Sequence, residues 1–364
     1  CLKLADMDYC REIVRTHAHL MLSYDGSSPD TYRVMRGNAN VLPLKLKAID
    51  NIGKLKDIRR RQATVISCIA KGLNEKDVPG ILQFCHDRRD FIGCLYLMPL
   101  AHTWNSASWN FSPDRMTTED CEMAIADAFP GYDVDFLPLG FTPQFSTLAK
   151  YVGREAPPYG AHPNCESLYY LVSDGEKWVP MEHYLKRPVT ETAKDLVALE
   201  KRLAAREKKW RKGLIGRMFG RLHLRDPILR LRGLLALLFF FVRQIRLGRL
   251  VKGRGLVKVG HAIALPFALI AGRRSHRALK RHSTVQGHLQ IIILPLEDNA
   301  IIETERLERC PTAHAYMNPR TEEIKFVPVC AWRMHNKKIL RDVADYYTAR
   351  GAATVASEGT AAGA

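Results

Sequence analysis

The chain has 364 residues, 46% of them hydrophobic, and a formal net charge of +17, so it is long enough for two folded domains of ordinary hydropathy. Within residues 201–282 the longest uncharged run, at 259–272, contains Pro266 and is shorter than the roughly 20 apolar residues that span a membrane. No signal-peptide pattern is visible, and nine cysteines without framework spacing indicate reduced thiols or metal ligands rather than disulfides.

The first region, residues 1–100, is predicted to alternate helices with strands. It begins at Cys1, and we expect further sequence upstream because the helical pattern starts at once. The predicted helices cover residues 7–15, 44–55 and 75–88, and the predicted strands cover residues 19–24, 63–70 and 91–98. These strands are apolar on both faces, which is typical of a parallel sheet in an α/β fold.

Ligands bind at the carboxyl ends of parallel strands, where this sequence places Ser23, Asp25, Asn74 and the turn at Met98. Asp25 is interpreted equally as a ligand contact or as a cap for the turn before Gly26. Arg36 could meet a carboxylate or be a solvated loop charge. Asn74 could contact a ligand, but its position favours the N-cap of the following helix.

The second region, residues 101–195, has an irregular pattern. It contains a predicted helix over residues 117–129, capped by Thr117, and a hairpin over residues 167–180 that turns at Asp174–Gly175. We find no Gly-rich phosphate loop, no Ser-His-Asp pattern and no zinc-protease helix anywhere in the chain.

The third region, residues 196–282, is a basic amphipathic helical segment. Residues 201–282 hold 23 Lys and Arg against Glu207 and Asp226, a net of +21, so the rest of the chain carries about −4. Leu203, Trp210, Leu214, Met218 and Leu222 share one predicted helical face, and Asp226–Pro227 is predicted to start the next helix as N-cap and first-turn proline.

Apolar runs interrupt these charges, which favours a surface that lies on an anionic membrane. Two other interpretations remain: amphipathic helices that pack on the protein and keep their charges solvated, and a nucleic-acid surface. The last is disfavoured because the segment offers Leu, Ile and Phe where polar and stacking groups are needed.

The fourth region, residues 283–348, has a predicted strand at 289–296, a hairpin of residues 313–316 and 324–329, and a helix at 338–347; residues 349–364 are predicted to be a disordered tail. The hairpin turns near residue 320, which places Cys310 opposite Cys330, and Cys165 lies in a turn-like run. These three thiols could hold an iron–sulfur cluster or be unrelated buried cysteines. Cys68, Cys85 and Cys94 are interpreted as core residues.

Three runs, "HLMLSYDGSSPDTYRVMRGNANVLPLKLKAIDNIGKL", "TVISCIAKGLNEKDVPGILQFC" and "FIGCLYLMPL", resemble the radical S-adenosylmethionine enzymes. They are similar to strands four to six of the (β/α)6 partial barrel of these enzymes. Two later runs, "HPNCESLYYLVSDGEKWVPMEHYLKRP" and "ERCPTAHAYMNPRTEEIKFVPVCAW", resemble a subgroup with the archaeal tetraether lipid synthase and its bacterial relatives, earlier grouped with pterin methyltransferase-like proteins.

The resemblance implies the second half of a partial barrel, followed by an α+β region, and the cofactors S-adenosylmethionine and a [4Fe-4S] cluster. The C-x3-C-x2-C loop that defines the family is absent from this sequence. We therefore expect that loop upstream, and we expect the polypeptide alone to be inactive. An open half-barrel would also leave a sheet edge at its first strand.

The resemblance also implies roles for individual residues. Ser23 and Asp25 would meet the ribose and methionine parts of S-adenosylmethionine, Arg36 its carboxylate, Asn74 its ribose or methionine end, and the backbone near Met98 its adenine. A further set, Cys165, Cys310 and Cys330, would hold an auxiliary iron–sulfur cluster.

The implied reaction is radical attack on an unactivated C–H bond of a lipid, with possible joining of hydrocarbon chains, supported by an electron donor such as ferredoxin or flavodoxin. The implied location is cytoplasmic, peripheral on the inner membrane face. Two alternatives stay open: radical methylation of a pterin-like small molecule, and a non-enzymatic basic protein that binds membrane or nucleic acid.

Overall fold

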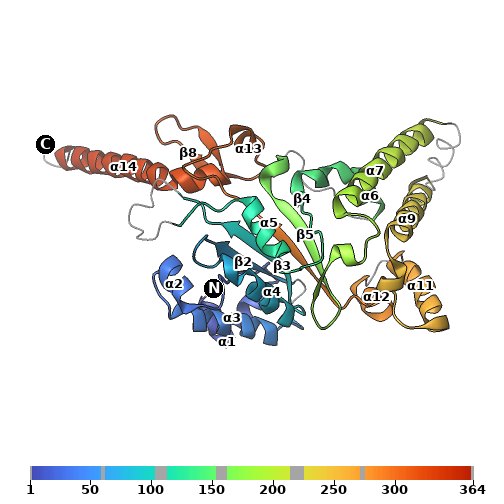
Figure 1. Cartoon of the computed structure of the whole chain (residues 1–364). Coiled ribbons are helices and arrows are strands. Elements are labelled where there is room, and N and C mark those ends of the chain that lie inside the picture. The colour runs from blue at the N-terminus through green and yellow to red at the C-terminus, as the bar shows by residue number, and fades with distance from the viewer. Residues whose placement is uncertain are drawn as a thin grey trace.

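A computed structural model describes residues 2–58, 62–102, 113–152, 162–213, 225–270 and 275–361. Its centre is a seven-stranded sheet (Figure 1). In spatial order the strands are β1 (Met21–Ser23), β2 (Ala63–Ile69), β3 (Ile92–Pro99), β7 (Gly287–Ile293), β5 (Ser167–Ser173) and β4 (Leu137–Pro138), with β6 (Trp178–Pro180) beside β5. The first four are parallel, and β5 runs antiparallel to β7. The prediction of an α/β fold with a parallel sheet is confirmed.

The strand β7 joins two parts of the chain that lie far apart in sequence. It pairs with β3 in parallel, with Leu95 opposite Ile291, and with β5 on its other side. The predicted first and fourth regions therefore share one sheet, whereas β1 lies at the edge of the sheet, as expected. The bounds of the predicted domains stay a prediction.

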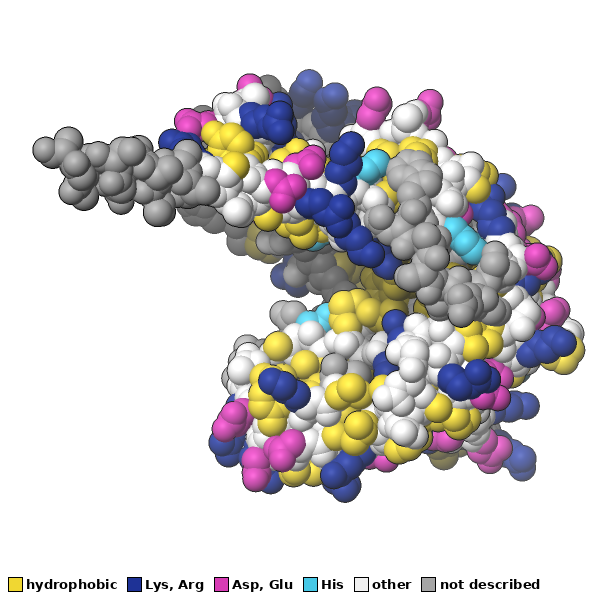
Figure 2. Space-filling view, turned by 90° about the vertical axis from the view of Figure 1, so that its left-hand side faces the viewer, with side chains coloured by type: hydrophobic (Ala, Val, Ile, Leu, Met, Phe, Trp, Pro, Cys, Tyr) yellow, Lys and Arg dark blue, Asp and Glu magenta, His cyan; other side chains and the backbone are white. Residues whose placement is uncertain are grey.

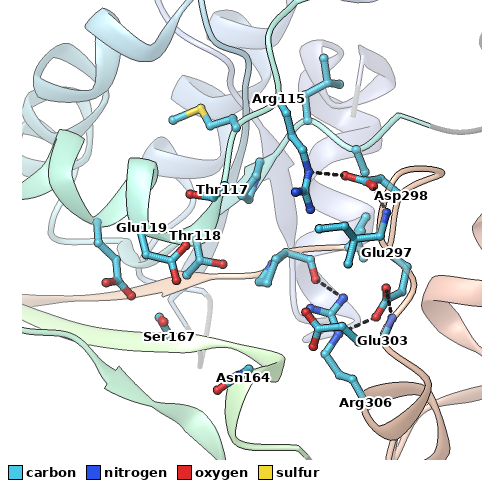
Figure 3. Close-up of a pocket in the computed structure, with 18 of the residues that line it drawn as sticks. Arg115, Thr117, Thr118, Glu119, Asn164, Ser167, Glu297, Asp298, Glu303 and Arg306 are labelled. Atoms are coloured by element: carbon cyan, nitrogen blue, oxygen red, sulfur yellow. Dashed lines mark hydrogen bonds and ion pairs between the residues drawn. The ribbon is translucent and has the colours of Figure 1, made fainter.

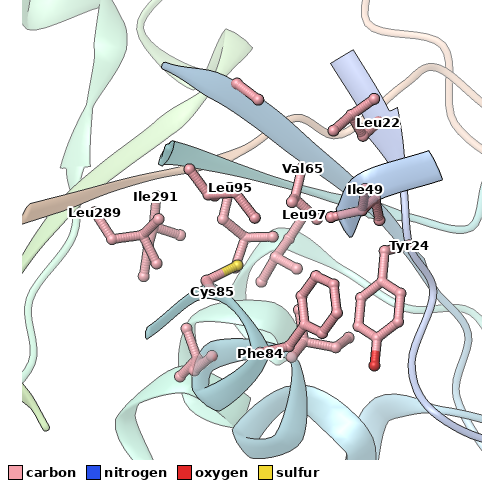
Figure 4. Packing of buried hydrophobic residues seen from close by; sticks show 14 of the residues in the cluster. Leu22, Tyr24, Ile49, Val65, Phe84, Cys85, Leu95, Leu97, Leu289 and Ile291 are labelled. Atoms are coloured by element: carbon pink, nitrogen blue, oxygen red, sulfur yellow. The ribbon is translucent and has the colours of Figure 1, made fainter. Parts of the chain in front are cut away.

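Helices cover one face of this sheet. They are α1 (Met7–Arg15), α2 (Pro29–Arg36), α3 (Val41–Lys54) and α4 (Val78–Asp87), with short 3-10 turns η1 (Leu2–Ala5) and η2 (Glu75–Asp77). Beneath them, the strand positions Leu22, Val65 and Leu95 are buried in the main core, and Tyr24 stacks on Phe84 of α4 with ring centroids 3.9 Å apart (Figure 4). Apolar side chains at helical spacing on α3 and α4 make this face because they lie on one side of each helix.

The opposite face of the sheet is only half-covered. Along each strand the side chains alternate between the two faces, and the positions on this second face are partly exposed. They include Ser23, Cys68, Tyr96 and Met98. Figure 2 shows the molecule hollowed, with hydrophobic side chains inside the hollow.

The region after β3 supplies shorter elements. They are α5 (Thr118–Ala126), η4 (Leu139–Phe145), α6 (Ser146–Tyr151), η5 (Pro163–Cys165) and η6 (Met181–His183). Thr117 caps α5 as predicted: its hydroxyl accepts from the Asp120 backbone N–H at 3.2 Å, within a capping box. The predicted hairpin is β5–β6, and its turn uses Gly175 at a φ of 112°.

The basic segment folds as helices at one end of the molecule (Figure 1). They are α7 (Val189–Lys212), α9 (Arg225–Gln244), α10 (Leu247–Leu250), α11 (Gly255–Ile270) and α12 (Ser275–His282). None of the described helices is both long and apolar enough to cross a membrane. The predicted face on Leu203 and Trp210 continues to Leu214, Met218 and Leu222, which lie outside the described residues. Asp226 lies within the first turn of α9 rather than before it.

The C-terminal part contains α13 (Thr304–Glu308), the hairpin of β8 (Ala313–Met317) and β9 (Ile324–Pro328), and α14 (Val329–Ala361). The predicted hairpin is confirmed, and its facing positions sum to 641, one more than expected, as in Ala313 opposite Pro328. The helix α14 is longer than the predicted 338–347 and replaces the tail predicted from residue 349. Small residues suggested disorder, but alanine is also the strongest helix former.

Candidate functional site

A cluster of polar side chains lies at the carboxyl ends of β1 and β2. We call Ser23, Asp25, Arg36, Lys45 and Asn74 the polar cluster. The carboxylate of Asp25 is fully buried just beyond β1. It accepts from Arg36 Nη2 at 2.9 Å and Nε at 3.1 Å, and from the Cys68 backbone N–H at 3.0 Å. Arg36 ends α2, and its side chain is 40% exposed. The ion pair between Asp25 and Arg36 was not predicted from the sequence.

Asn74 connects the loops after β1 and β2. Its side chain is fully buried and donates to Asp25 O at 2.8 Å and Cys68 O at 2.9 Å, and its Oδ1 accepts from the Ala70 N–H at 2.8 Å. It makes no side-chain cap hydrogen bond to η2. Asn74 therefore occupies the predicted N-cap position of η2, but its side chain does not cap the turn: it satisfies buried backbone groups of both loops and holds them together.

Lys45 places a buried cation in the same cluster. It lies on α3, is almost fully buried, and its Nζ donates to the hydroxyl of Ser23 and to Ser23 O at 3.1 Å. Burial lowers the pKa of Lys45, and the nearby Asp25 opposes this effect. Lys45 was not predicted from the sequence. Its signal was the spacing from Leu42 and Ile49, which puts a lysine on the buried face of the helix.

Tyr32 also belongs beside this cluster and was not predicted. Its side chain is fully buried. Its hydroxyl accepts a hydrogen bond from the Asp25 backbone N–H at 2.9 Å and donates one to Gly26 O at 3.1 Å. Burial raises the pKa of this phenol far above its ordinary value. The tyrosine therefore stays neutral and fixes the loop that carries Asp25.

A pocket of about 480 Å³ lies further along the same edge, directly beyond β3 and β7 (Figure 3). Pro99 and Leu100 line it from β3, and the run from Pro295 to Asp298 lines it from β7. Two ion pairs frame it: Arg115 Nε to Asp298 Oδ2 at 3.1 Å, and the buried pair of Arg306 Nε and Glu297 Oε1 at 2.8 Å. Met98, the last predicted cofactor contact, lies on the half-covered sheet face and immediately precedes Pro99 in the sequence. This volume suits a small ligand or part of a larger one.

Burial raises the pKa of two carboxyl groups near this edge of the sheet, of which Glu122 lines the pocket. Glu122 lines the pocket, and burial raises its pKa while a hydrogen bond from Ser167 opposes the rise. Glu166 lies at the start of β5, where burial raises its pKa to about 7. A group with this pKa can give or take a proton near neutral pH. Neither residue was predicted, since nothing in their local sequence pattern marks burial.

The three predicted metal-binding thiols lie in one neighbourhood beside the pocket. Burial raises the pKa of Cys165 to about 11, and the nearby Glu166, Cys330 and Cys310 also act to raise it. Cys330 is the second residue of α14, and Cys310 donates its S–H to Thr312 O at 3.1 Å. Among the described residues, no group of three or more His, Cys, Asp or Glu side chains has the arrangement of a metal site. The metal assignment stays a prediction.

Comparison with known proteins gives one distant relative. No protein-family model matches the chain. Over 189 residues, half of this chain, it is 24% identical to the 7,8-dihydro-6-hydroxymethylpterin dimethyltransferase of Methanocaldococcus jannaschii. The matched region spans 37% of that protein, so the chain corresponds to a minor part of it. The relative is an enzyme, which supports an enzymatic function in general.

Proposed function

We propose that the chain forms part of a radical S-adenosylmethionine enzyme and that the polar cluster contributes to the cofactor site. The observation that carries this proposal is the pair of cations, Arg36 and Lys45, beside Ser23 at the carboxyl edge of a parallel sheet. A cofactor with a carboxylate and ribose hydroxyls suits this set of groups. The distant methyltransferase relative supports the same class of chemistry.

The residues present fit S-adenosylmethionine in two roles, direct contact with the cofactor and positioning of the contacting residues. Arg36 keeps an exposed part, and Ser23 is partly exposed, so these two side chains can reach a ligand, while the buried Lys45 holds the Ser23 hydroxyl in place. Asp25 and Asn74 are buried and already bonded within the protein, so we assign them to positioning rather than to direct contact. The backbone near Met98 remains the proposed site for adenine.

S-adenosylmethionine and a reduced [4Fe-4S] cluster together supply a carbon radical that takes hydrogen from an unactivated C–H bond. In this proposal a ferredoxin or flavodoxin delivers the electron. The thiols of Cys165, Cys310 and Cys330 have the donor chemistry of an auxiliary iron–sulfur site, since such clusters are held by cysteine thiolates. The raised pKa values of Cys165 and Cys330 mean that binding iron there would release protons.

The proposed substrate is a hydrocarbon chain of a lipid, because a saturated C–H bond offers no handle for acid–base chemistry. The half-covered sheet face, with Tyr96 and Met98, could receive such a chain. A second candidate is methylation of a pterin, which the name of the relative favours. Turnover with lipid but not pterin, or the reverse, separates the two.

The test uses the gene product that contains this chain, purified without oxygen, with iron and sulfide measured first. Incubation with S-adenosylmethionine and a reductant should give 5′-deoxyadenosine. Lys45→Met should weaken cofactor binding about tenfold to a hundredfold, as expected for one charged hydrogen bond. Lys47→Met is the matched control, because it lies exposed on the same helix. The proposal is contradicted if the purified protein holds no iron. It is also contradicted if both variants bind the cofactor as tightly as the unchanged protein does.

A further inference from the structure

The helix α9 is apolar on two opposite sides. One side, with Leu229, Leu237 and Phe240, packs in a second core against α6 and α7. The other side carries exposed large apolar side chains spaced by four, four and three residues, which places them on one stripe. They are Leu231, Leu235, Phe239 and Val242, and Phe239 is 71% exposed. The folding of the helix onto the protein therefore leaves an apolar stripe uncovered.

The helix α11 repeats this arrangement. Its buried side carries Leu265 and packs on α12. Its exposed side carries Leu256, Val259, Ile263 and Phe267, again spaced by three and four residues, and Leu256 is 90% exposed. Both helices lie at the same end of the molecule (Figure 1). Exposed apolar side chains at this density mark an interaction surface rather than ordinary scatter.

The charge around the two stripes has one sign. Residues 227–270 contain eight Lys and Arg and no Asp or Glu. Arg232 and Arg243 lie on one flank of the α9 stripe by helical geometry, and Arg246, Arg249 and Arg254 follow in the connection to α11; all five are exposed. A partner for this surface must therefore accept bulky apolar side chains and supply negative charge.

We infer that the apolar stripes of α9 and α11 seat on the surface of an anionic lipid bilayer, with both helices lying in the interface. Apolar side chains would enter the acyl region while the flanking arginines meet lipid phosphates. A second copy of the chain is disfavoured because it would bring like charges together. A nucleic acid would leave the exposed Phe and Leu side chains without apolar cover.

A groove beside the α9 stripe has the same chemistry. It has a volume of about 820 Å³ between α7 and α9, and Leu235 belongs both to its lining and to the stripe. Leu203, Trp210 and Leu229 make its walls apolar, whereas Arg232, Arg206 and Lys209 supply cations. A single lipid suits this groove, with an acyl chain on the walls and a phosphate at the cations.

The stripes are fixed to the rest of the protein, so the bilayer would orient the whole molecule. Gln244, at the end of α9, is buried and donates to Asp195 Oδ2 at 2.8 Å. Backbone hydrogen bonds join Lys186 N–H to Gln244 O at 2.8 Å and Arg246 N–H to Tyr184 O at 2.7 Å. This inference does not depend on the proposed enzyme activity.

The test is co-sedimentation of the full chain with vesicles of pure phosphatidylcholine and of phosphatidylcholine mixed with phosphatidylglycerol. Replacement of Phe239, Leu256 and Phe267 by Ser should weaken binding to anionic vesicles by about tenfold per residue, from the loss of apolar burial. Replacement of Arg243, Arg246 and Arg254 by Gln should weaken it by about fivefold per residue and remove most of its salt dependence.

Two control variants match these changes elsewhere on the surface. One replaces Met317, Ile324 and Phe326 of the β8–β9 hairpin by Ser, and Phe326 is 71% exposed. The other replaces the exposed Lys3, Lys47 and Lys76 by Gln. Circular dichroism confirms that each variant is folded. The inference is overturned if binding survives both the Ser and the Gln replacements, or if the control variants lose as much binding. It is also overturned if single-stranded nucleic acid alone displaces the protein from the vesicles.

Discussion

The ion pair of Asp25 and Arg36 allows a sharp test of how the polar cluster is built. Asp25 is fully buried, whereas the Arg36 side chain is 40% exposed. Arg36→Met therefore leaves a buried carboxylate whose remaining hydrogen-bond donor, among the described residues, is the Cys68 backbone N–H. Removing one partner of a buried pair costs about 3–5 kcal/mol. We expect the lower end, about 3 kcal/mol, because that backbone donor and the nearby Lys45 remain.

The reverse substitution should be milder. Asp25→Asn removes the charge but keeps an acceptor for Cys68 N–H, and Arg36 can turn toward water, so we expect a loss of about 1–2 kcal/mol. The double variant should then resemble Asp25→Asn alone, which means that Asp25→Asn rescues Arg36→Met. Urea unfolding of all four proteins measures this cycle, and hydrogen exchange at residues 64–76 locates it. Equal losses from both single variants, or a double variant worse than either, would refute the reasoning.

Two further predictions test the structure elsewhere. Glu166 holds its proton more tightly in the folded state, with a pKa of about 7 against an ordinary 4.5, so stability should fall as pH rises through this range. After allowance for solvent screening we expect a loss of about 1–2 kcal/mol between pH 4 and pH 8, absent in Glu166→Gln; parallel urea midpoints of the two proteins would contradict this. Gly233→Ala puts a Cβ 2.0 Å from a Tyr151 ring carbon and should cost about 1–3 kcal/mol. Gly260→Ala, which meets nothing within 4 Å, should instead stabilise slightly, and equal thermal midpoints for the two variants would show that α9 does not pack on Tyr151.

Local patterns in the sequence predicted local structure well. The helix α1 has the predicted bounds, and the β5–β6 hairpin turns at the predicted glycine. The position of β7 beside β3 could not be predicted, because nearly 190 residues separate the two strands and no local signal encodes their pairing. In the same way Asn74 has the sequence position of a helix cap, but its side chain bonds to backbone of a loop almost 50 residues away.

The half-covered sheet explains why part of the polar cluster is accessible to the proposed ligand. Parallel strands are usually buried on both faces, and here their sequences are apolar on both. Helices cover the face with Leu22, Val65 and Leu95, whereas the face with Tyr96 and Met98 stays partly exposed. Polar groups enclosed on both sides would need hydrogen-bond partners within the protein, as Asp25 and Asn74 have. Ser23 and Arg36 keep exposed atoms because they border the uncovered face, so the same structural feature that leaves an apolar surface open also leaves charged groups accessible beside it. A ligand with an apolar part and an anionic part would meet both requirements at once.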